Sequence, residues 1–176
     1  MFEHVGQAQF GAYTSRLFDL LRPGGRLLNH AISRPPSTPS APFAELRGRA
    51  RKVGVAAGVV SAGRVHSPFV ERYVFPDGEL LEVGIVVSTL QEGGFEVRHV
   101  ESLREHYPLT LRRWVANLER NWDEAVAQVG EARARIWRLY MAGSALGFER
   151  YGVSIHQVLA VKPDGGRSGL PLRPRF

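Results

Sequence analysis

The chain has 176 residues, of which 44% are hydrophobic and 23% charged, as is typical of one globular domain with its own core. It has no cysteine, which excludes disulfides, zinc–thiolate sites and thiol nucleophiles. The net charge of +6 would suit an anionic partner, either phospholipid headgroups or nucleic acid, but an arginine-rich proteome explains it as simply. The longest weakly polar stretch, residues 53–63, is far shorter than the roughly 20 residues of a membrane-spanning helix.

The first part of the chain predicts a helix, a turn and a strand. Apolar residues recur at helical spacing in residues 7–21, and Pro23-Gly24-Gly25 ends the pattern. RLLNHAI then has the length and composition of a strand, so this region predicts one step of an α/β fold with a parallel sheet. Residues 34–66 are rich first in proline and serine and then in glycine, which predicts an insertion of low order.

The remainder of the chain predicts a helix, a strand, two helices and a last strand. In order, these are ELLEVGIVVSTLQEGG, FEVRHVESL, LTLRRWVANLERNWDEAV, EARARIWRLYMAGSALGFE and VSIHQVLAV. The alternation in FEVRHVESL has one irregular step near His99, and Pro108 suits the first turn of the helix that follows. Residues 162–176, rich in glycine, proline and arginine, are expected to form a disordered tail.

Residues 1–161 therefore contain about three strands, too few for a doubly wound sheet, because one edge and much of two faces would be uncovered. We expect the chain to be the carboxyl-terminal half of a larger α/β domain.

Residues that can exchange protons or hold an anion are expected at one edge of this sheet. His30 ends the first strand, Tyr107 follows the second, and Glu3 precedes the first helix, where an earlier strand would just have ended. Ligands of open α/β sheets bind at the carboxyl edge, so this convergence favours a site. Each residue also has a structural interpretation, as a hydrogen-bonded strand end or as half-buried packing. No nucleotide-binding glycine motif and no metal-ligand spacing of histidines accompanies them, so no metal is expected.

Several ordered motifs resemble the carboxyl-terminal part of the cyclopropane-fatty-acyl-phospholipid synthases and the mycolic acid cyclopropane synthases. They are MFEHVG, LRPGGRLLNHAI, RYVFPDGEL, SLREHYPLTLRRW, WRLYMAGSALGFE and HQVLAVK. The resemblance implies the carboxyl-terminal half of a class I, Rossmann-like S-adenosylmethionine-dependent methyltransferase, with extra helices over an acyl site. Such enzymes deliver a methyl group to the cis double bond of an unsaturated phospholipid acyl chain, and a cyclopropane ring closes through a carbocation.

The resemblance also implies site residues. The family holds a bicarbonate ion near the cation, and its ligands correspond to Glu3, His30 and Tyr107. An acyl pocket corresponds to Ile32, Phe75, Leu80, Leu111, Tyr140, Ser144 and Phe148, each of which is as readily explained as plain core. Tyr140, Ser144 and Phe148 recur every four residues on one helix face, and aromatic rings on such a face can stabilise a cation.

Two parts of the family's site are expected upstream of the motifs in this chain. The glycine-rich loop that binds S-adenosylmethionine precedes MFEHVG in the family, and so does a cysteine of the bicarbonate site. The insertion at 34–66 also replaces a shorter link. We therefore expect a truncated form, with Met1 corresponding to an internal residue of the family's fold, that is inactive by itself.

Two functions remain open. The chain is either part of a methyltransferase, or a catalytically inactive remnant or split half that binds a separate amino-terminal half. A nucleic-acid-binding module rests on charge alone, and no nucleic acid partner is expected. The expected location is cytoplasmic, with peripheral contact at the inner face of the membrane.

Overall fold

The computed structural model describes residues 2–36 and 68–173. Its elements are η1 (Phe2–His4), α1 (Gln7–Leu20), β1 (Arg26–Ser33), α3 (Pro68–Tyr73), α4 (Val83–Glu92), β2 (Glu96–Ser102), α5 (Tyr107–Arg120), α6 (Trp122–Val129), α7 (Glu131–Glu149) and β3 (Ser154–Val161). The predicted order of helices and strands is confirmed, with α5 and α6 dividing one predicted helix and with the short α3 added. The predicted insertion lies, from residue 37 onward, outside the described residues.

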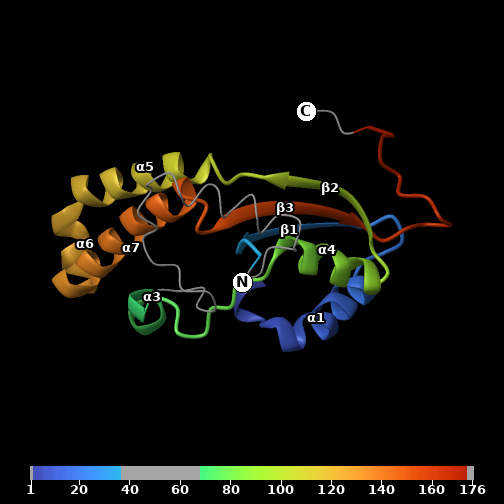
Figure 1. Cartoon of the computed structure of the whole chain (residues 1–176), viewed down its shortest axis with the longest axis horizontal. Coiled ribbons are helices and arrows are strands. Elements are labelled where there is room, and N and C mark those ends of the chain that lie inside the picture. Colours follow the sequence, from blue (N-terminus) through green and yellow to red (C-terminus); the bar gives the residue numbers. More distant parts are fainter. Residues whose placement is uncertain (1, 37–67, 174–176) are drawn as a thin grey trace, which may run out of the picture.

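The three strands form one sheet in the order β1-β3-β2 (Figure 1). β3 runs antiparallel to both neighbours, so the expected parallel pairing is wrong. The reason is the route between β2 and β3. Helices α5–α7 leave the sheet and return to it at the same end, so β3 must run back against β2 (Figure 1). The predicted irregular step in β2 is confirmed, because its register shifts between Val97 and His99.

Helices α1 and α4 lie on one face of the sheet and make the larger core with it (Figure 1). Its buried members are Phe10, Ala31, Leu81, Val86, Leu90, Phe95, Val158 and Ala160. The apolar residues of α1 and α4 recur at helical spacing, so each helix presents one apolar stripe to the sheet. The burial of these side chains supplies the main stabilisation of this half of the molecule.

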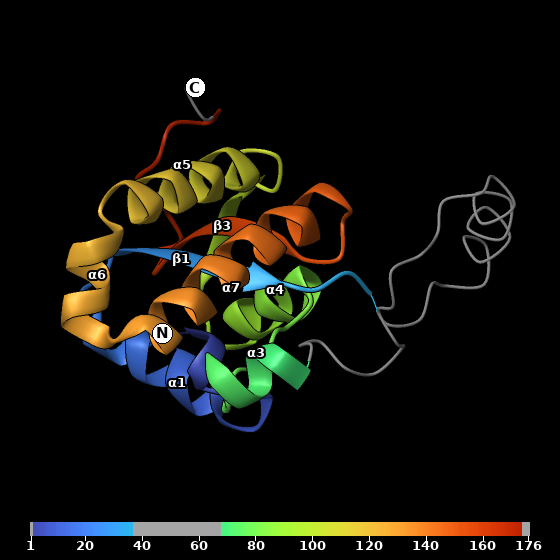
Figure 2. The ribbon, with the colours of Figure 1, turned by 90° about the vertical axis from the view of Figure 1, so that its left-hand side faces the viewer.

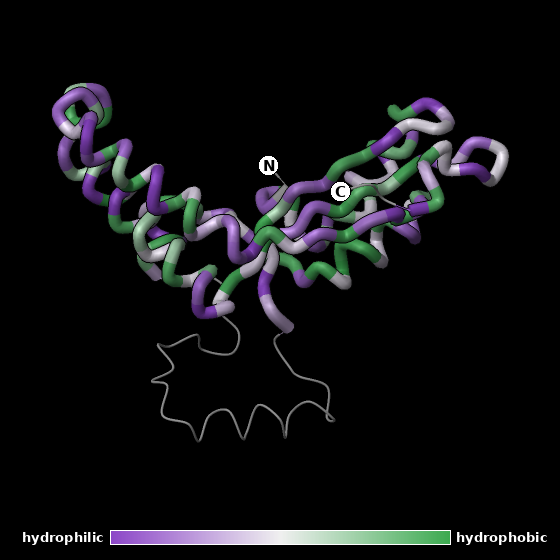
Figure 3. Tube along the Cα trace, turned by 90° about the horizontal axis from the view of Figure 1, so that it is seen from above, coloured by the Kyte–Doolittle hydropathy of each residue, from purple (hydrophilic) through white to green (hydrophobic). Residues whose placement is uncertain are grey.

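Helices α5–α7 form an arm at the other end of the sheet, seen end-on in Figure 2 and from above in Figure 3. A second core of Leu111, Ala145, Phe148 and Ile155 joins α5 and α7 to β3. Hydrophobic and hydrophilic residues alternate along the arm in Figure 3, as in helices that bury one face only. No helix among the described residues is long and apolar enough to cross a membrane.

The tail that was expected to be disordered is described up to residue 173. Two backbone hydrogen bonds join Lys162 to the turn before β1. The N–H of Gly24 donates to the carbonyl of Lys162 at 2.8 Å, and the N–H of Lys162 donates to the carbonyl of Gly25 at 2.9 Å. The Lys162 ammonium also donates to the carbonyl of Phe18 at 2.8 Å and lies 4.3 Å from the centre of its ring. These contacts attach the start of the tail to α1 and to the beginning of β1.

Gly6 caps α1 in a backbone conformation with φ 74° and ψ 153°, a region that is essentially restricted to glycine. A Cβ at this position would also meet Glu79 Oε2 at 3.2 Å. We expect Gly6→Ala to lower the free energy of unfolding by about 1–3 kcal/mol in denaturant titrations. Gly11→Ala is the matched control on the same helix. Its added Cβ meets nothing within 4 Å, so it should raise stability by about 0.4–1 kcal/mol. Equal effects of the two variants would contradict this account of Gly6.

Candidate functional site

Glu3 lies at the outer edge of β1. Its Oε1 accepts a hydrogen bond from the backbone N–H of Ile32 at 2.9 Å. In an antiparallel pair, alternate residues direct both backbone groups away from the partner strand. Ile32 and Arg34 are such residues, because the next outward N–H, that of Arg34, donates to Leu81 O at 3.1 Å. The Glu3 carboxylate therefore occupies a backbone position on the edge of β1 that a further strand would otherwise approach.

The environment of Glu3 keeps it ionised. Burial by itself would raise the pKa of this carboxyl, but hydrogen bonds from backbone N–H groups, that of Ile32 first, hold the pKa below its usual range. Glu3 is therefore a partly buried negative charge at neutral pH. It can accept a further hydrogen bond or stabilise a positive charge nearby.

Tyr107 and Tyr140 lie within the electrostatic field of Glu3. Burial raises the pKa of the Tyr107 phenol, and the charge of Glu3 raises it further. Burial likewise raises the pKa of Tyr140, to which Tyr107 and Glu3 add, while a hydrogen bond with Ser144 acts in the opposite direction. Both phenols therefore stay protonated at neutral pH and can donate hydrogen bonds. The predicted Glu3 and Tyr107 are therefore close enough for the charge of Glu3 to act on the Tyr107 phenol.

Tyr140 belongs to the same charged neighbourhood, which sequence reasoning missed because it placed this residue in the acyl pocket only. The four-residue spacing of Tyr140 and Ser144 on α7 was the available signal, since it puts the phenol and the hydroxyl on one helix face.

His30 lies on β1 beside this group. Its exposed ring has Nδ1 3.1 Å from the amide nitrogen of Gln157 on β3. His30 and Ile32 share one face of the strand and are separated by one strand repeat, roughly 7 Å. The side-chain contact of His30 is thus with Gln157. The strand places His30 near Glu3 and Tyr107 without a hydrogen bond to either residue.

The predicted acyl-pocket residues lie in three places: the second core, the edge of the first core and an aromatic cluster. Ile32, Leu111 and Phe148 pack in the second core together with Tyr107, whose ring centre lies 4.9 Å from that of Phe148. Leu111 and Phe148 are only 3% and 2% exposed, so in this structure they are packed core. Leu80 is 4% exposed and buried next to Leu81 of the first core.

Phe75 and Tyr140 form an aromatic cluster with His4 and Trp137. The ring centre of Phe75 lies 5.7 Å from those of His4 and Tyr140 and 6.3 Å from that of Trp137. In Figure 2, α7 accordingly lies between α5 and the amino-terminal segment with α3. Trp137 was not predicted, although it precedes Tyr140 by one helical turn in the same motif. The cluster places aromatic faces beside the Glu3 segment.

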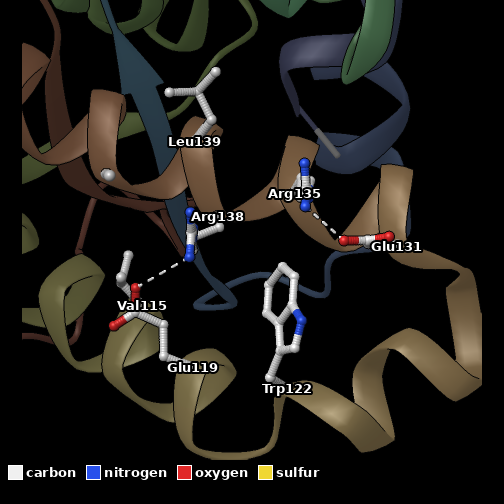
Figure 4. Close-up of a pocket in the computed structure, with 8 residues that line it drawn as sticks. Val115, Glu119, Trp122, Glu131, Arg135, Arg138 and Leu139 are labelled. Atoms are coloured by element: carbon white, nitrogen blue, oxygen red, sulfur yellow. Dashed lines mark hydrogen bonds and ion pairs between the residues drawn. The ribbon is translucent and has the colours of Figure 1, made fainter.

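A separate pocket of about 660 Å³ lies among α5, α6 and α7 (Figure 4). It is lined by Val115, Glu119, Trp122, Glu131, Arg135, Arg138, Leu139 and Ala142. Its arginines pair with acidic neighbours, Arg135 with Glu131 at 2.6 Å and Arg138 with Glu119 at 3.7 Å. Helical periodicity puts these α7 residues on the side opposite to Tyr140 and Ser144. This pocket therefore lies on the other side of α7 from the neighbourhood of Glu3, Tyr107 and Tyr140.

Comparison with known proteins places these observations in a family context. The sequence model of the mycolic acid cyclopropane synthetase family matches residues 1–158. The chain is 42% identical over 173 residues to a probable fatty acid methyltransferase of Mycobacterium tuberculosis, covering 98% of this chain and 35% of that protein. It is 43% identical over 163 residues to a probable fatty acid methyltransferase of Pseudomonas putida, covering 93% of this chain and 36% of that protein. The chain thus spans about a third of the length of these relatives.

Solved structures show the same fold. A mycolic acid cyclopropane synthase, CmaA1, complexed with SAH and CTAB, superposes with a TM-score of 0.70 at 27% identity. The cyclopropane synthase MmaA2 from Mycobacterium tuberculosis gives a TM-score of 0.70 at 23% identity. In both cases the match covers 92% of this chain and 52% of the other.

The charge of Glu3 should be measurable through the tyrosines. We expect Glu3→Gln to lower the pKa values of Tyr107 and Tyr140, because the negative charge that disfavours phenolate is removed, while burial keeps both above the ordinary value. The measurement is a pH titration of the tyrosine ring carbons by ¹³C NMR. Glu92→Gln, which removes an exposed carboxylate at the end of α4, is the control and should leave both unchanged. An unshifted Tyr107 in Glu3→Gln would contradict the proximity of the two groups.

Proposed function

Because this chain belongs to the mycolic acid cyclopropane synthetase family, we propose that it forms the acyl-binding and proton-handling part of a lipid methyltransferase. The family and the fold are those of S-adenosylmethionine-dependent methyltransferases. The proposed reaction is methyl transfer to the cis double bond of an unsaturated fatty acyl chain of a phospholipid, which gives a cyclopropane fatty acid. The observation that supports it best is the ionised Glu3 beside two protonated tyrosines and an aromatic cluster.

S-adenosylmethionine, when bound, supplies the methyl group of its sulfonium. The family's glycine-rich loop for this cofactor precedes the MFEHVG motif, so its binding is assigned to a part of the fold upstream of Glu3. The role of the present residues is to receive the acyl chain and the positive charge that develops on it.

A negative charge and the exclusion of water together suit these residues to stabilising a positive charge on the acyl chain. A carbocation is stabilised by a fixed negative charge most strongly where water is excluded, because a low dielectric strengthens the attraction. Glu3 provides the charge, and the packed side chains around Ile32, Tyr107 and Phe148 exclude water from one side of it. The rings of Phe75 and Tyr140 add aromatic faces, which attract cations.

Glu3, His30 and Tyr107 would hold a bicarbonate ion, which supplies a proton acceptor when bound. These groups fit such an ion chemically. The Tyr107 hydroxyl, which is protonated at neutral pH, would donate to an anionic oxygen, and an imidazole N–H of His30 would offer a second donor. The ionised Glu3 accepts the hydrogen bond of the bicarbonate hydroxyl and thereby orients it.

The outer edge of β1 supports the requirement for a further half of the fold. By the alternation that exposes the N–H groups of Ile32 and Arg34, those of Leu28 and His30 also point to this edge. An open strand edge is a template for another strand. The side chain of Leu28 is 56% exposed, as expected of an apolar strand residue whose cover lies elsewhere. We assign this edge to the cofactor-binding half, whether it precedes these residues in one polypeptide or is a separate chain.

The second candidate is a catalytically inactive remnant, or one half of a split methyltransferase that acts as a partner-binding subunit. It is favoured by the share of the relatives' length that this chain spans, 35% and 36%. For the methyltransferase, a lipid substrate would place the protein peripherally at the inner face of the membrane. The arm offers exposed apolar residues for that contact, among them Leu109 and Leu139, each 60% exposed.

The need for the other half is tested by methyl transfer from labelled S-adenosylmethionine to vesicles of unsaturated phospholipid. We expect no transfer by this chain alone and measurable transfer once the family's preceding half is supplied, fused or mixed. Vesicles of saturated phospholipid are the control, since they lack the double bond. Turnover by the isolated chain would overturn the requirement for a second half, and a completed but inactive protein would favour the remnant.

The three anion-holding residues are tested in the completed enzyme. We expect Glu3→Gln, His30→Ala and Tyr107→Phe each to lower turnover by about 10²–10⁴-fold, the usual contribution of positioned proton-transfer groups. Binding of lipid vesicles should change little, because the substitutions remove polar groups and Tyr107→Phe keeps the ring that packs against Phe148. Glu124→Gln, an exposed substitution on α6, is the control and should retain wild-type turnover. Wild-type rates in all three variants would remove these residues from the mechanism.

A further inference from the structure

Glu79 makes two hydrogen bonds to the segment that carries Glu3, and together they form a bracket around it. Its backbone N–H donates to the carbonyl of Glu3 at 2.8 Å, and its Oε2 accepts from the backbone N–H of Gln7, also at 2.8 Å. Glu79 is 72 residues from Gln7 in the chain, so this bracket is a tertiary contact. It closes around the few residues that connect η1 to α1.

This bracket replaces a local cap at the start of α1. The first N–H groups of a helix have no partner within it and are usually met by a side chain at the N-cap. Here the N-cap is Gly6, which has no side chain, and the helix has no side-chain cap from that position. The Glu79 carboxylate takes that place, where the helix dipole also favours negative charge. Gly6 leaves room for it, since a Cβ would come within 3.2 Å of Glu79 Oε2.

The same turn touches the aromatic cluster. Phe75, four residues before Glu79, places its ring 5.7 Å from His4 and 5.7 Å from Tyr140. Residues 75–79 therefore bind the Glu3 segment on one side and face α7 on the other. The position of Glu3 relative to Tyr140 depends on this turn.

We propose that Glu79 is a positioning residue for Glu3. Glu79 binds both the carbonyl of Glu3 and the first backbone N–H of α1. These two bonds hold η1 in the position in which Oε1 of Glu3 accepts the hydrogen bond from the N–H of Ile32. Glu79 itself acts only through Glu3. The consequence for catalysis rests on the proposed function, because a misplaced catalytic group lowers turnover, whereas the positioning itself is independent of turnover.

The test compares variants of the full chain by NMR. Its readouts are the pKa of the Glu3 carboxyl and the hydrogen-exchange rate of the Ile32 amide. Glu79→Ala should raise the pKa of Glu3 toward its ordinary value and speed exchange at Ile32 by about tenfold or more, because the bond between them is populated less. Glu79→Gln keeps an oxygen that accepts from Gln7, so it should leave exchange at Ile32 near that of the wild type.

The sign of the pKa change separates positioning from simple electrostatics. Loss of a nearby negative charge would by itself lower the pKa of Glu3, so a rise in Glu79→Ala has to come from the lost geometry. Asp77→Ala is the matched control, because it removes one carboxylate from the same turn; it should not raise the pKa of Glu3.

A second variant covers the case in which Glu79→Ala does not fold. Glu79→Asp keeps the charge and the backbone bond but shortens the side chain by one methylene, so it should shift both readouts in the direction of Glu79→Ala. Wild-type values of both readouts in Glu79→Ala, or in Glu79→Asp where only that variant folds, would overturn the proposal. The proposed function fails separately, if Glu3→Gln in the completed enzyme retains full turnover.

Discussion

The site depends on one hydrogen bond, from the backbone N–H of Ile32 to the carboxylate of Glu3. It attaches the amino-terminal segment to the outer edge of β1 and lowers the pKa of Glu3 against the opposing effect of burial. A buried carboxylate without such donors would take up a proton and lose its charge. The bond therefore fixes where the negative charge lies and favours the ionised form of Glu3.

Two layers of contacts hold that bond in place. The first is made by residues 79–82: Glu79 binds the Glu3 segment at two points. Arg34, just after β1, holds the residues that follow Glu79, because it donates to Leu80 O at 3.1 Å and pairs with Glu82 at 2.8 Å. On the side of the helical arm, α7 presents Tyr140 to Glu3 and anchors itself by Phe148, which is almost fully buried. One helix thus serves both packing and chemistry, because its apolar and polar site residues share a face.

Much of the local structure was predictable, since it depends on neighbours in the chain. The breaker at Pro23-Gly24-Gly25 separates α1 from β1 as predicted, and the irregular step in β2 falls at the predicted place. The direction of β3 was not predictable from its alternating pattern, because a strand has the same periodicity whichever way it runs. Only the return of α7 to the end of the sheet that α5 leaves settles it.

The sequence by itself determined the family, the order of the elements and the residue types of the site, since motifs and periodicity are local properties of a chain. It also placed Tyr140, Ser144 and Phe148 on one helix face. Tertiary structure decided which groups meet: Glu3 with the edge of β1, the two tyrosines with its charge, His30 with Gln157, and Glu79 with Gln7, 72 positions away. These pairings arise from the packing of segments remote in the chain, and no spacing along the sequence encodes a distance of that kind.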